Sequence, residues 1–93
     1  MFSIPRPNVI ESTESFAVEV LGRTGLLYSE AGKSLRMDSE VLAGPSGMVV
    51  YTDSINYWDP PHHIEPFSDI ERQRVIENIR AAFKFRGYDI QIQ

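Results

Sequence analysis

The letters SDIERQRVIENIRAAFKFRG occupy residues 68–87 and predict one long helix. Ser68 and Glu71 match a capping box, in which each side chain bonds to the backbone N–H of the other residue. Acidic residues stand in the first turn and basic residues in the last, as the helix macrodipole favours, and Gly87 supplies a natural stop. Apolar residues at helical spacing predict a buried stripe; they are Ile70, Val75, Ile76, Ile79, Ala82 and Phe83.

The residues ahead of this helix favour β-structure. Phe16, Val18 and Val20 share one face of an alternating run, which is typical of a half-buried strand. Ala31-Gly32-Lys33 is typical of a hairpin turn, because glycine adopts positive φ at no steric cost. The predicted strands cover residues 16–21, 26–30, 34–37, 40–43 and 48–52, and the turn Gly44-Pro45-Ser46-Gly47 precedes the last of them.

The chain after the helix returns to β-structure, since Tyr88, Ile90 and Ile92 alternate with polar residues. The order of elements predicts an α+β fold: an antiparallel β-meander sheet covered on one face by a single long C-terminal helix, followed by a final strand. A chain of 93 residues fits a single domain over residues 1–93. Pro5 and Pro7 restrict the backbone, so we expect residues 1–8 to form an extended or poorly ordered lead.

Residues 53–67 predict an irregular connection between the sheet and the helix. Asp53-Ser54 can cap a single helical turn that carries Ile55 and Trp58. Asp59-Pro60-Pro61 ends that turn, because proline has no N–H and the residue before a proline avoids the α region.

The composition excludes several classes of protein. Thirteen acidic and nine basic residues give a formal net charge of −4, and no cysteine is present. A net negative chain is poorly suited to bind the phosphate backbone of nucleic acid, which needs clustered Lys and Arg. The absence of cysteine removes disulfide scaffolds, thiolate metal sites and Cys nucleophiles. No apolar stretch approaches the roughly 20 residues that cross a bilayer, and Pro5-Arg6-Pro7 interrupts any signal-peptide core, so we expect a cytoplasmic protein without nucleic-acid or membrane partners.

Charge is unevenly distributed along the chain. Residues 1–69 hold ten acidic and four basic residues, a net −6, whereas residues 70–93 hold three acidic and five basic residues, a net +2. Ordinary solubility explains such a surface, but the acidic part also suits a protein partner with a basic surface.

The sequence gives weak support for catalysis or metal binding. Four possible metal ligands lie close together in the sequence: Asp59, His62, His63 and Glu65. Adjacent histidines on an extended chain point to opposite sides, and no Cys or i, i+4 His pair completes a closed site. Two pairs of carboxylates are also present, Asp38 with Glu40 and Asp53 with Asp59. In some enzymes one carboxylate of such a pair acts as the acid and the other as the base. We therefore predict no catalytic residue, metal or cofactor, and keep as an alternative a small enzyme that uses a carboxylate pair or the His62/His63 loop.

The segment around Tyr57-Trp58 has the composition of a protein-binding hot spot, because aromatic residues are enriched in such sites. It predicts a non-enzymatic binding protein whose partner-binding residues are Asp53, Asn56, Tyr57, Trp58, Asp59 and Glu40. Trp58 can instead pack between helix and sheet. Tyr57 is then the residue more available to a partner, since neighbouring side chains usually face apart. A further alternative is a structural homodimer that pairs the mostly uncharged final strand, Tyr88–Ile92, across an interface.

Three motifs together resemble a known family. They are MVVYTDSINYWD at residues 48–59, with the pattern Y-x-D-S-I-x-x-W, SDIER at residues 68–72, and the helix continuation with Ile76, Ile79 and Gly87. Over roughly residues 15–93 the chain is similar to a bacterial family of polymorphic-toxin immunity proteins, immunity protein seventy-four. The resemblance implies a small cytosolic protein that neutralises a cognate toxin by direct binding, and we expect that toxin domain to have a basic surface.

Overall fold

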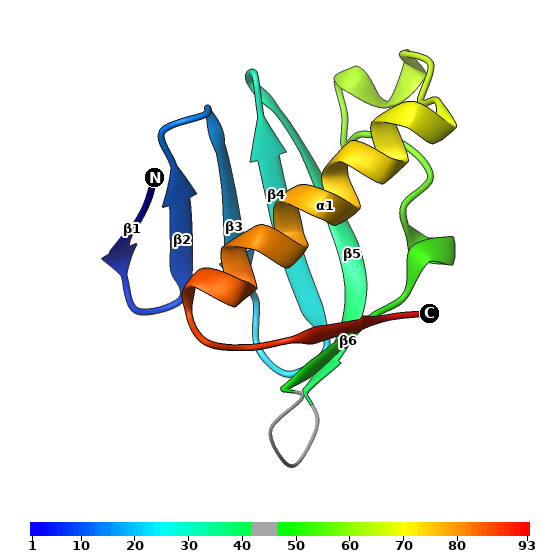
Figure 1. Cartoon of the computed structure of the whole chain (residues 1–93). Helices are drawn as coiled ribbons and strands as arrows, with labels where there is room; N and C mark the ends of the chain where they lie inside the picture. The colour runs from blue at the N-terminus through cyan, green and yellow to red at the C-terminus, as the bar shows by residue number, and fades with distance from the viewer. Residues whose placement is uncertain (42–46) are drawn as a thin grey trace.

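The computed structural model describes residues 1–41 and 47–93. A curled sheet of seven strands packs against one long helix, which crosses one face of the sheet (Figure 1). The elements in chain order are β1 (Phe2–Arg6), β2 (Val9–Ser12), β3 (Phe16–Val20), β4 (Gly25–Glu30), β5 (Lys33–Val41), β6 (Met48–Val50), the 3-10 helices η1 (Thr52–Ser54) and η2 (His62–Ile64), α1 (Asp69–Phe85) and β7 (Ile90–Ile92). The predicted α+β arrangement of a sheet, a single helix and a final strand is confirmed.

The strands lie in the sheet in the order of the chain, from β1 at one edge to β7 at the other. Each of the first five pairings is antiparallel, as a meander requires. β7 differs, because it pairs parallel to β6. α1 returns the chain to the end of the sheet at which β6 begins, so the next strand runs in the same direction as β6. The edge position of β7 is the one that the homodimer hypothesis requires, and that hypothesis stays a prediction.

Local sequence signals set both ends of α1. The Ser68 hydroxyl accepts a hydrogen bond from the Glu71 backbone N–H at 3.1 Å, and the Glu71 carboxylate accepts one from the Ser68 N–H at 3.2 Å. Gly87 follows the helix with φ of 87°, a left-handed conformation that favours glycine. The predicted capping box and the predicted stop are both confirmed.

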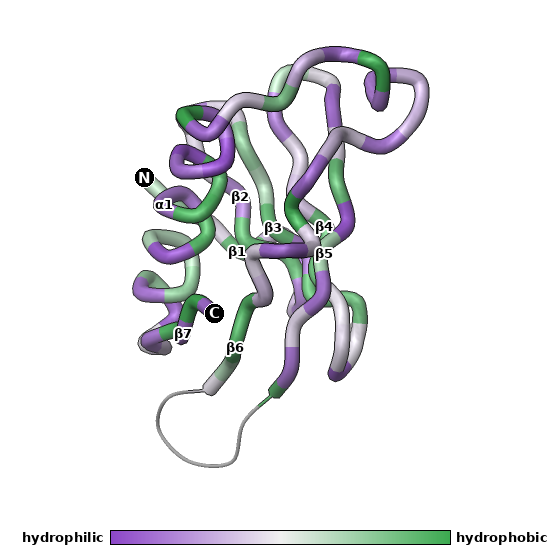
Figure 2. The backbone as a smooth tube through the Cα atoms, turned by 90° about the vertical axis from the view of Figure 1, so that its right-hand side faces the viewer, coloured by the Kyte–Doolittle hydropathy of each residue, from purple (hydrophilic) through white to green (hydrophobic). Residues whose placement is uncertain are grey.

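The core lies between α1 and the facing side of the sheet, which form two layers in Figure 2. Ile10, Val18, Tyr28 and Leu35 occupy paired positions across β2 to β5 and are almost fully buried. The helix contributes the buried residues Val75, Ile76, Ile79, Ala82 and Phe83, as the stripe predicts. Within residues 1–41 and 47–93, no helix is long and apolar enough to cross a membrane.

A polar network at the margin of this core joins α1 to the sheet. The Tyr28 hydroxyl donates to Glu30 Oε1 at 2.7 Å and accepts from Asn78 Nδ2 at 2.8 Å. Arg74 Nη2 donates to Glu30 Oε2 at 2.7 Å. Burial raises the pKa of the Tyr28 hydroxyl far above its ordinary value, so the group remains a protonated donor. The buried hydroxyl therefore has both of the partners that it needs.

Strands β1 and β2 are not among the strands predicted from the sequence. Residues 2–6 are extended and pair with β2. Phe2 packs its ring on Phe16 and Phe85, with centroids 5.9 and 5.4 Å away. Pro5 is accommodated because an edge strand has one side without ladder partners.

The middle of the chain differs from the prediction in two places. β5 extends through residues 40–41, which the sequence assigns to a separate strand; residues 42–43 of that strand and residues 44–46 of the predicted turn lie outside the described residues. β6 ends at Val50, two residues earlier than predicted. Ser54 explains the early turn, because its hydroxyl donates to the Tyr51 carbonyl at 2.6 Å and accepts from the Asp38 N–H at 2.9 Å.

Candidate functional site

Residues 52–71 lie beside β5 and reach the first turn of α1, passing through η1 and η2 (Figure 1). We call them the acidic segment, because they include five acidic residues and no Lys or Arg: Asp53, Asp59, Glu65, Asp69 and Glu71. Five of the six predicted partner-binding residues belong to this segment.

Trp58 anchors the acidic segment in the core. Its side chain is 0% exposed, stacks on Tyr28 with centroids 6.4 Å apart and meets Phe67 edge-on at 5.3 Å. Its indole N–H has no hydrogen-bond partner among the described residues, so packing holds it in place. Of the two roles that the sequence allows for Trp58, the structure places the residue in the packing one.

Hydrogen bonds to its backbone groups attach the same stretch to the helix and the sheet. Arg72 Nε donates to the Ile55 carbonyl at 2.9 Å. The Asp59 N–H donates to the Ser34 carbonyl, at the start of β5, at 2.7 Å. Ile55, like Trp58, is fully buried. Residues 55–59 therefore form a short stretch that is fixed at both of its ends.

The remaining predicted residues of this stretch face outward. Asp53 and Asn56 are exposed, and the Asn56 amide donates to the Asp53 carbonyl, which holds the turn after η1. Tyr57 is 61% exposed, although both Ile55 and Trp58 are buried. Asp59 is half-buried. The fixed backbone thus presents an exposed aromatic ring between acidic residues.

Glu40 reaches the acidic segment through Tyr51. The exposed Glu40 carboxylate accepts a hydrogen bond from the Tyr51 hydroxyl at 2.8 Å, and this bond raises the pKa of Tyr51. Because Ser54 of η1 bonds to the Tyr51 carbonyl, Glu40 and η1 share one neighbour. In the part of the chain that the structure describes, the sixth predicted residue is thus connected to the segment only through Tyr51.

A second attachment involves the predicted histidine loop. His62 Nδ1 lies 2.6 Å from Glu65 Oε2, and Lys33 Nζ lies 2.9 Å from Glu65 Oε1. These partners, Lys33 first, lower the pKa of the Glu65 carboxyl. Lys33 also lies over the Trp58 ring, 5.5 Å from its centroid. Among the residues that the structure describes, no three His, Cys, Asp or Glu side chains are grouped so that they could hold a metal ion.

Two strongly exposed residues of the acidic segment were not predicted from the sequence. Ile64 in η2 is 82% exposed, and Ile70 in the first turn of α1 is 80% exposed. The prediction that Ile70 belongs to the buried stripe is wrong. A usable signal exists for it, because residues three, four and seven positions later are Gln73, Arg74 and Glu77, so Ile70 lies on the polar face of the helix.

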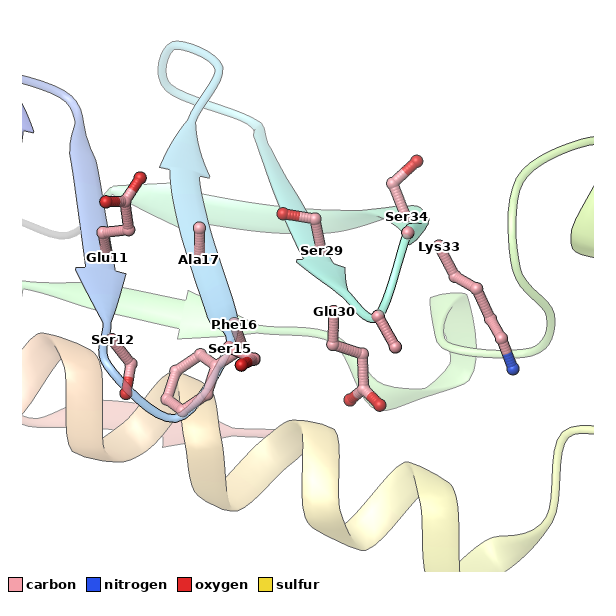
Figure 3. Close-up of a pocket in the computed structure, with 11 residues that line it drawn as sticks. Glu11, Ser12, Ser15, Phe16, Ala17, Ser29, Glu30, Lys33 and Ser34 are labelled. Carbon is pink, nitrogen blue, oxygen red and sulfur yellow. The ribbon is translucent and has the colours of Figure 1, made fainter.

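Two hollows open elsewhere on the surface, the first of which adjoins a predicted residue at Ser34, whose carbonyl accepts from the Asp59 N–H. One, of about 520 Å³, opens on the side of the sheet that α1 leaves uncovered, where Ala17, Ser29 and Ser34 are paired across β3 to β5 (Figure 3). The other, of about 470 Å³, lies between the end of α1, β6 and the β1–β2 turn, with Phe83 and Arg86 in its wall. No predicted partner-binding residue lines either hollow.

Comparison with known proteins gives one match. A family model described as Immunity protein 74 matches residues 17–93. No curated protein and no solved structure matches the chain.

Proposed function

This chain belongs to the immunity protein 74 family, and from that premise we propose that it neutralises a cognate bacterial toxin by binding it directly. It acts in the cytoplasm and without catalysing a reaction. The toxin is its protein partner, and the acidic segment together with Glu40 is the surface that binds it.

The observation that carries this proposal is the exposed ring of Tyr57 on a fixed backbone. Tyr57 is 61% exposed, whereas the residues on either side of the Asn56-Tyr57 pair are fully buried. A side chain on a backbone that is already fixed requires no ordering of that backbone when a partner binds. Aromatic residues supply much of the binding energy at protein interfaces.

Charge supports a partner with a basic surface. Within the described residues, neither Asp53 nor Asp59 lies within ion-pair distance of a Lys or Arg side chain. Their charges are therefore available to a partner. Lys and Arg residues on a toxin domain would be attracted to this surface and would associate faster at low salt.

The test uses the toxin domain encoded next to this gene, inactivated by a substitution in its own active site. Tyr57→Ala is expected to weaken binding by about 2 kcal/mol, roughly 30-fold in Kd, and Asp59→Lys by a similar amount. Calorimetry measures the affinity, and growth of cells that express the active toxin measures protection.

Matched controls stand elsewhere on the surface. Ile4→Ala removes an apolar side chain that is 44% exposed, and Glu14→Lys reverses an exposed charge in the β2–β3 turn. Both are expected to bind like the unaltered chain. If Tyr57→Ala and Asp59→Lys change the affinity by less than about 0.5 kcal/mol, which is far below hot-spot values, the surface is assigned wrongly.

A further inference from the structure

The most exposed large apolar side chains of the described residues lie close together in the sequence. Met1 apart, the three highest exposed fractions belong to Ile64 at 82%, Ile70 at 80% and Tyr57 at 61%. The other large apolar residues that are exposed reach at most 49%. All three lie within residues 57–70 of the acidic segment. Single exposed apolar residues are common on protein surfaces, whereas a concentration of them marks an interaction site.

Each of these side chains stands next to residues that are fixed in place. Tyr57 precedes the fully buried Trp58. Ile64 lies between His62 and Glu65, which bond to each other, and Glu65 is also bonded to Lys33. The fold therefore holds the backbone at these two positions and directs the side chains outward.

Ile70 is held in the same way. It lies between Ser68 and Glu71, the two residues of the capping box. The neighbouring Asp69 is bonded to Arg72, which also bonds to the Ile55 carbonyl. The first turn of α1 is thus attached to the stretch that carries Tyr57.

We propose that Ile64 and Ile70 extend the toxin-binding surface from Tyr57, and that the toxin meets these three residues with apolar hollows bordered by Lys and Arg. This inference rests on the proposed function and adds both residues and partner chemistry to it. Asp53 and Asp59, which have no Lys or Arg side chain within ion-pair distance among the described residues, select the cationic border.

The same charge argues against other occupants of this surface. A symmetric pair of copies that used it would bring like charges together, because the same patch meets itself across a twofold axis. A membrane surface with anionic lipids would repel the acidic side chains. A toxin domain with a basic surface is the occupant that fits.

The experiment compares Ile64→Gln, Ile70→Gln and the double variant with Ile4→Gln, which makes the same change at a position that is 44% exposed. The probe is the inactivated toxin domain encoded next to this gene, and calorimetry gives Kd. Each single variant is expected to weaken binding about 5-fold or more and the double variant about 20-fold or more, as for interface residues with near-additive effects. Ile4→Gln is expected to stay within about 2-fold, as for an exposed position outside an interface.

A charge series at one position tests the cationic border separately. Ile70→Lys is expected to weaken binding more than Ile70→Gln, and Ile70→Glu less than Ile70→Lys, because the partner surface is positive. Thermal melting checks that all three variants are folded at the temperature of the binding measurement. The order of the three affinities remains informative even if one variant lowers the melting temperature.

The outcomes separate this inference from the proposed function. If the unaltered chain binds the toxin domain and Tyr57→Ala weakens it, but the double variant binds normally, only the extension to Ile64 and Ile70 is overturned. An affinity order that favours Ile70→Lys overturns the cationic border. If the unaltered chain neither binds nor protects against the toxin, the proposed function falls and the extension falls with it.

Discussion

The interior turns of α1 and the acidic segment place apolar side chains in opposite ways. Between residues 75 and 83, every member of the predicted stripe is buried against the sheet. In the acidic segment two apolar residues are fully buried, while three are mostly exposed: Tyr57, Ile64 and Ile70. The comparison teaches that apolar content does not by itself separate core from interface. A core residue has a packed side chain. An interface residue has an exposed side chain, and only the residues next to it are packed.

The largest expected effect is at Trp58, where the two regions meet. Trp58→Ala is expected to lower the free energy of unfolding by about 3–5 kcal/mol, because it leaves a cavity between the helix and the sheet. Trp58→Phe is the control, since it keeps most of the packing and gives up an N–H that has no partner among the described residues. Urea unfolding followed by circular dichroism measures both. A loss below about 1 kcal/mol for Trp58→Ala, far under the usual cavity cost, would mean that the core does not hold the acidic segment.

A smaller effect distinguishes two tyrosines of the two regions. Tyr28→Phe is expected to cost about 1–2 kcal/mol, because Asn78 loses its acceptor and Glu30 a donor at the margin of the core. Tyr57→Phe removes the same hydroxyl from an exposed ring and is expected to stay within about 0.5 kcal/mol. Equal losses in thermal unfolding would show that the buried network does not set the stability of the core.

The pH dependence of stability tests the attachment of η2. The pKa of Glu65 is lowered, first by Lys33 and then by His62. A carboxyl with a lowered pKa stabilises the fold above the pKa that it has in the unfolded chain, and this contribution is lost as the pH falls through the lowered value. We expect Glu65→Gln to melt below the unaltered chain at pH 7, and the difference to shrink as the pH falls below about 4.5. Glu14→Gln is the control, because it removes an exposed carboxylate without an ion pair among the described residues, and it is expected to melt close to the unaltered chain at pH 7.

The smallest expected effect sharpens the comparison within one helix. Ile70→Gln is expected to change the free energy of unfolding by less than about 0.5 kcal/mol, whereas Ile79→Ala is expected to cost about 2–5 kcal/mol. The exposed fractions are 80% and 1%. Denaturant unfolding of the two variants measures the contrast, and a large loss for Ile70→Gln would place that residue in the core after all.

The parts of the fold that depend on local signals were predictable. The capping box at Ser68, the stop at Gly87 and the stripe of α1 are each decided within a few residues of the chain. The pairing of β1 with β2 was not, because Pro5 and Pro7 argue locally against a strand, and only the long-range pairing with β2 puts Pro5 at the edge of a sheet. The parallel direction of β7 follows from the crossover through α1, a non-local property that alternation does not encode.

The candidate site was predictable in part, for the same reason. The composition around Tyr57-Trp58 indicated a binding segment, but only the packed structure determines which of the two rings is buried. Ile70 had a local signal in its polar helical neighbours. Ile64 had none, because its position depends on the bond between Glu65 and Lys33, which lie 32 residues apart in the sequence.

The burial of Trp58 also gives the protein an internal optical probe. The chain has one tryptophan, which is fully buried next to the exposed Tyr57 in the sequence and has Lys33 over its ring. Its fluorescence therefore comes from a single defined environment, shielded from water in the folded state. Unfolding exposes the indole and shifts its emission to longer wavelength. We expect a partner bound to the acidic segment to change the surroundings of Lys33 and of the ring, and the emission of the unlabelled protein would then report association.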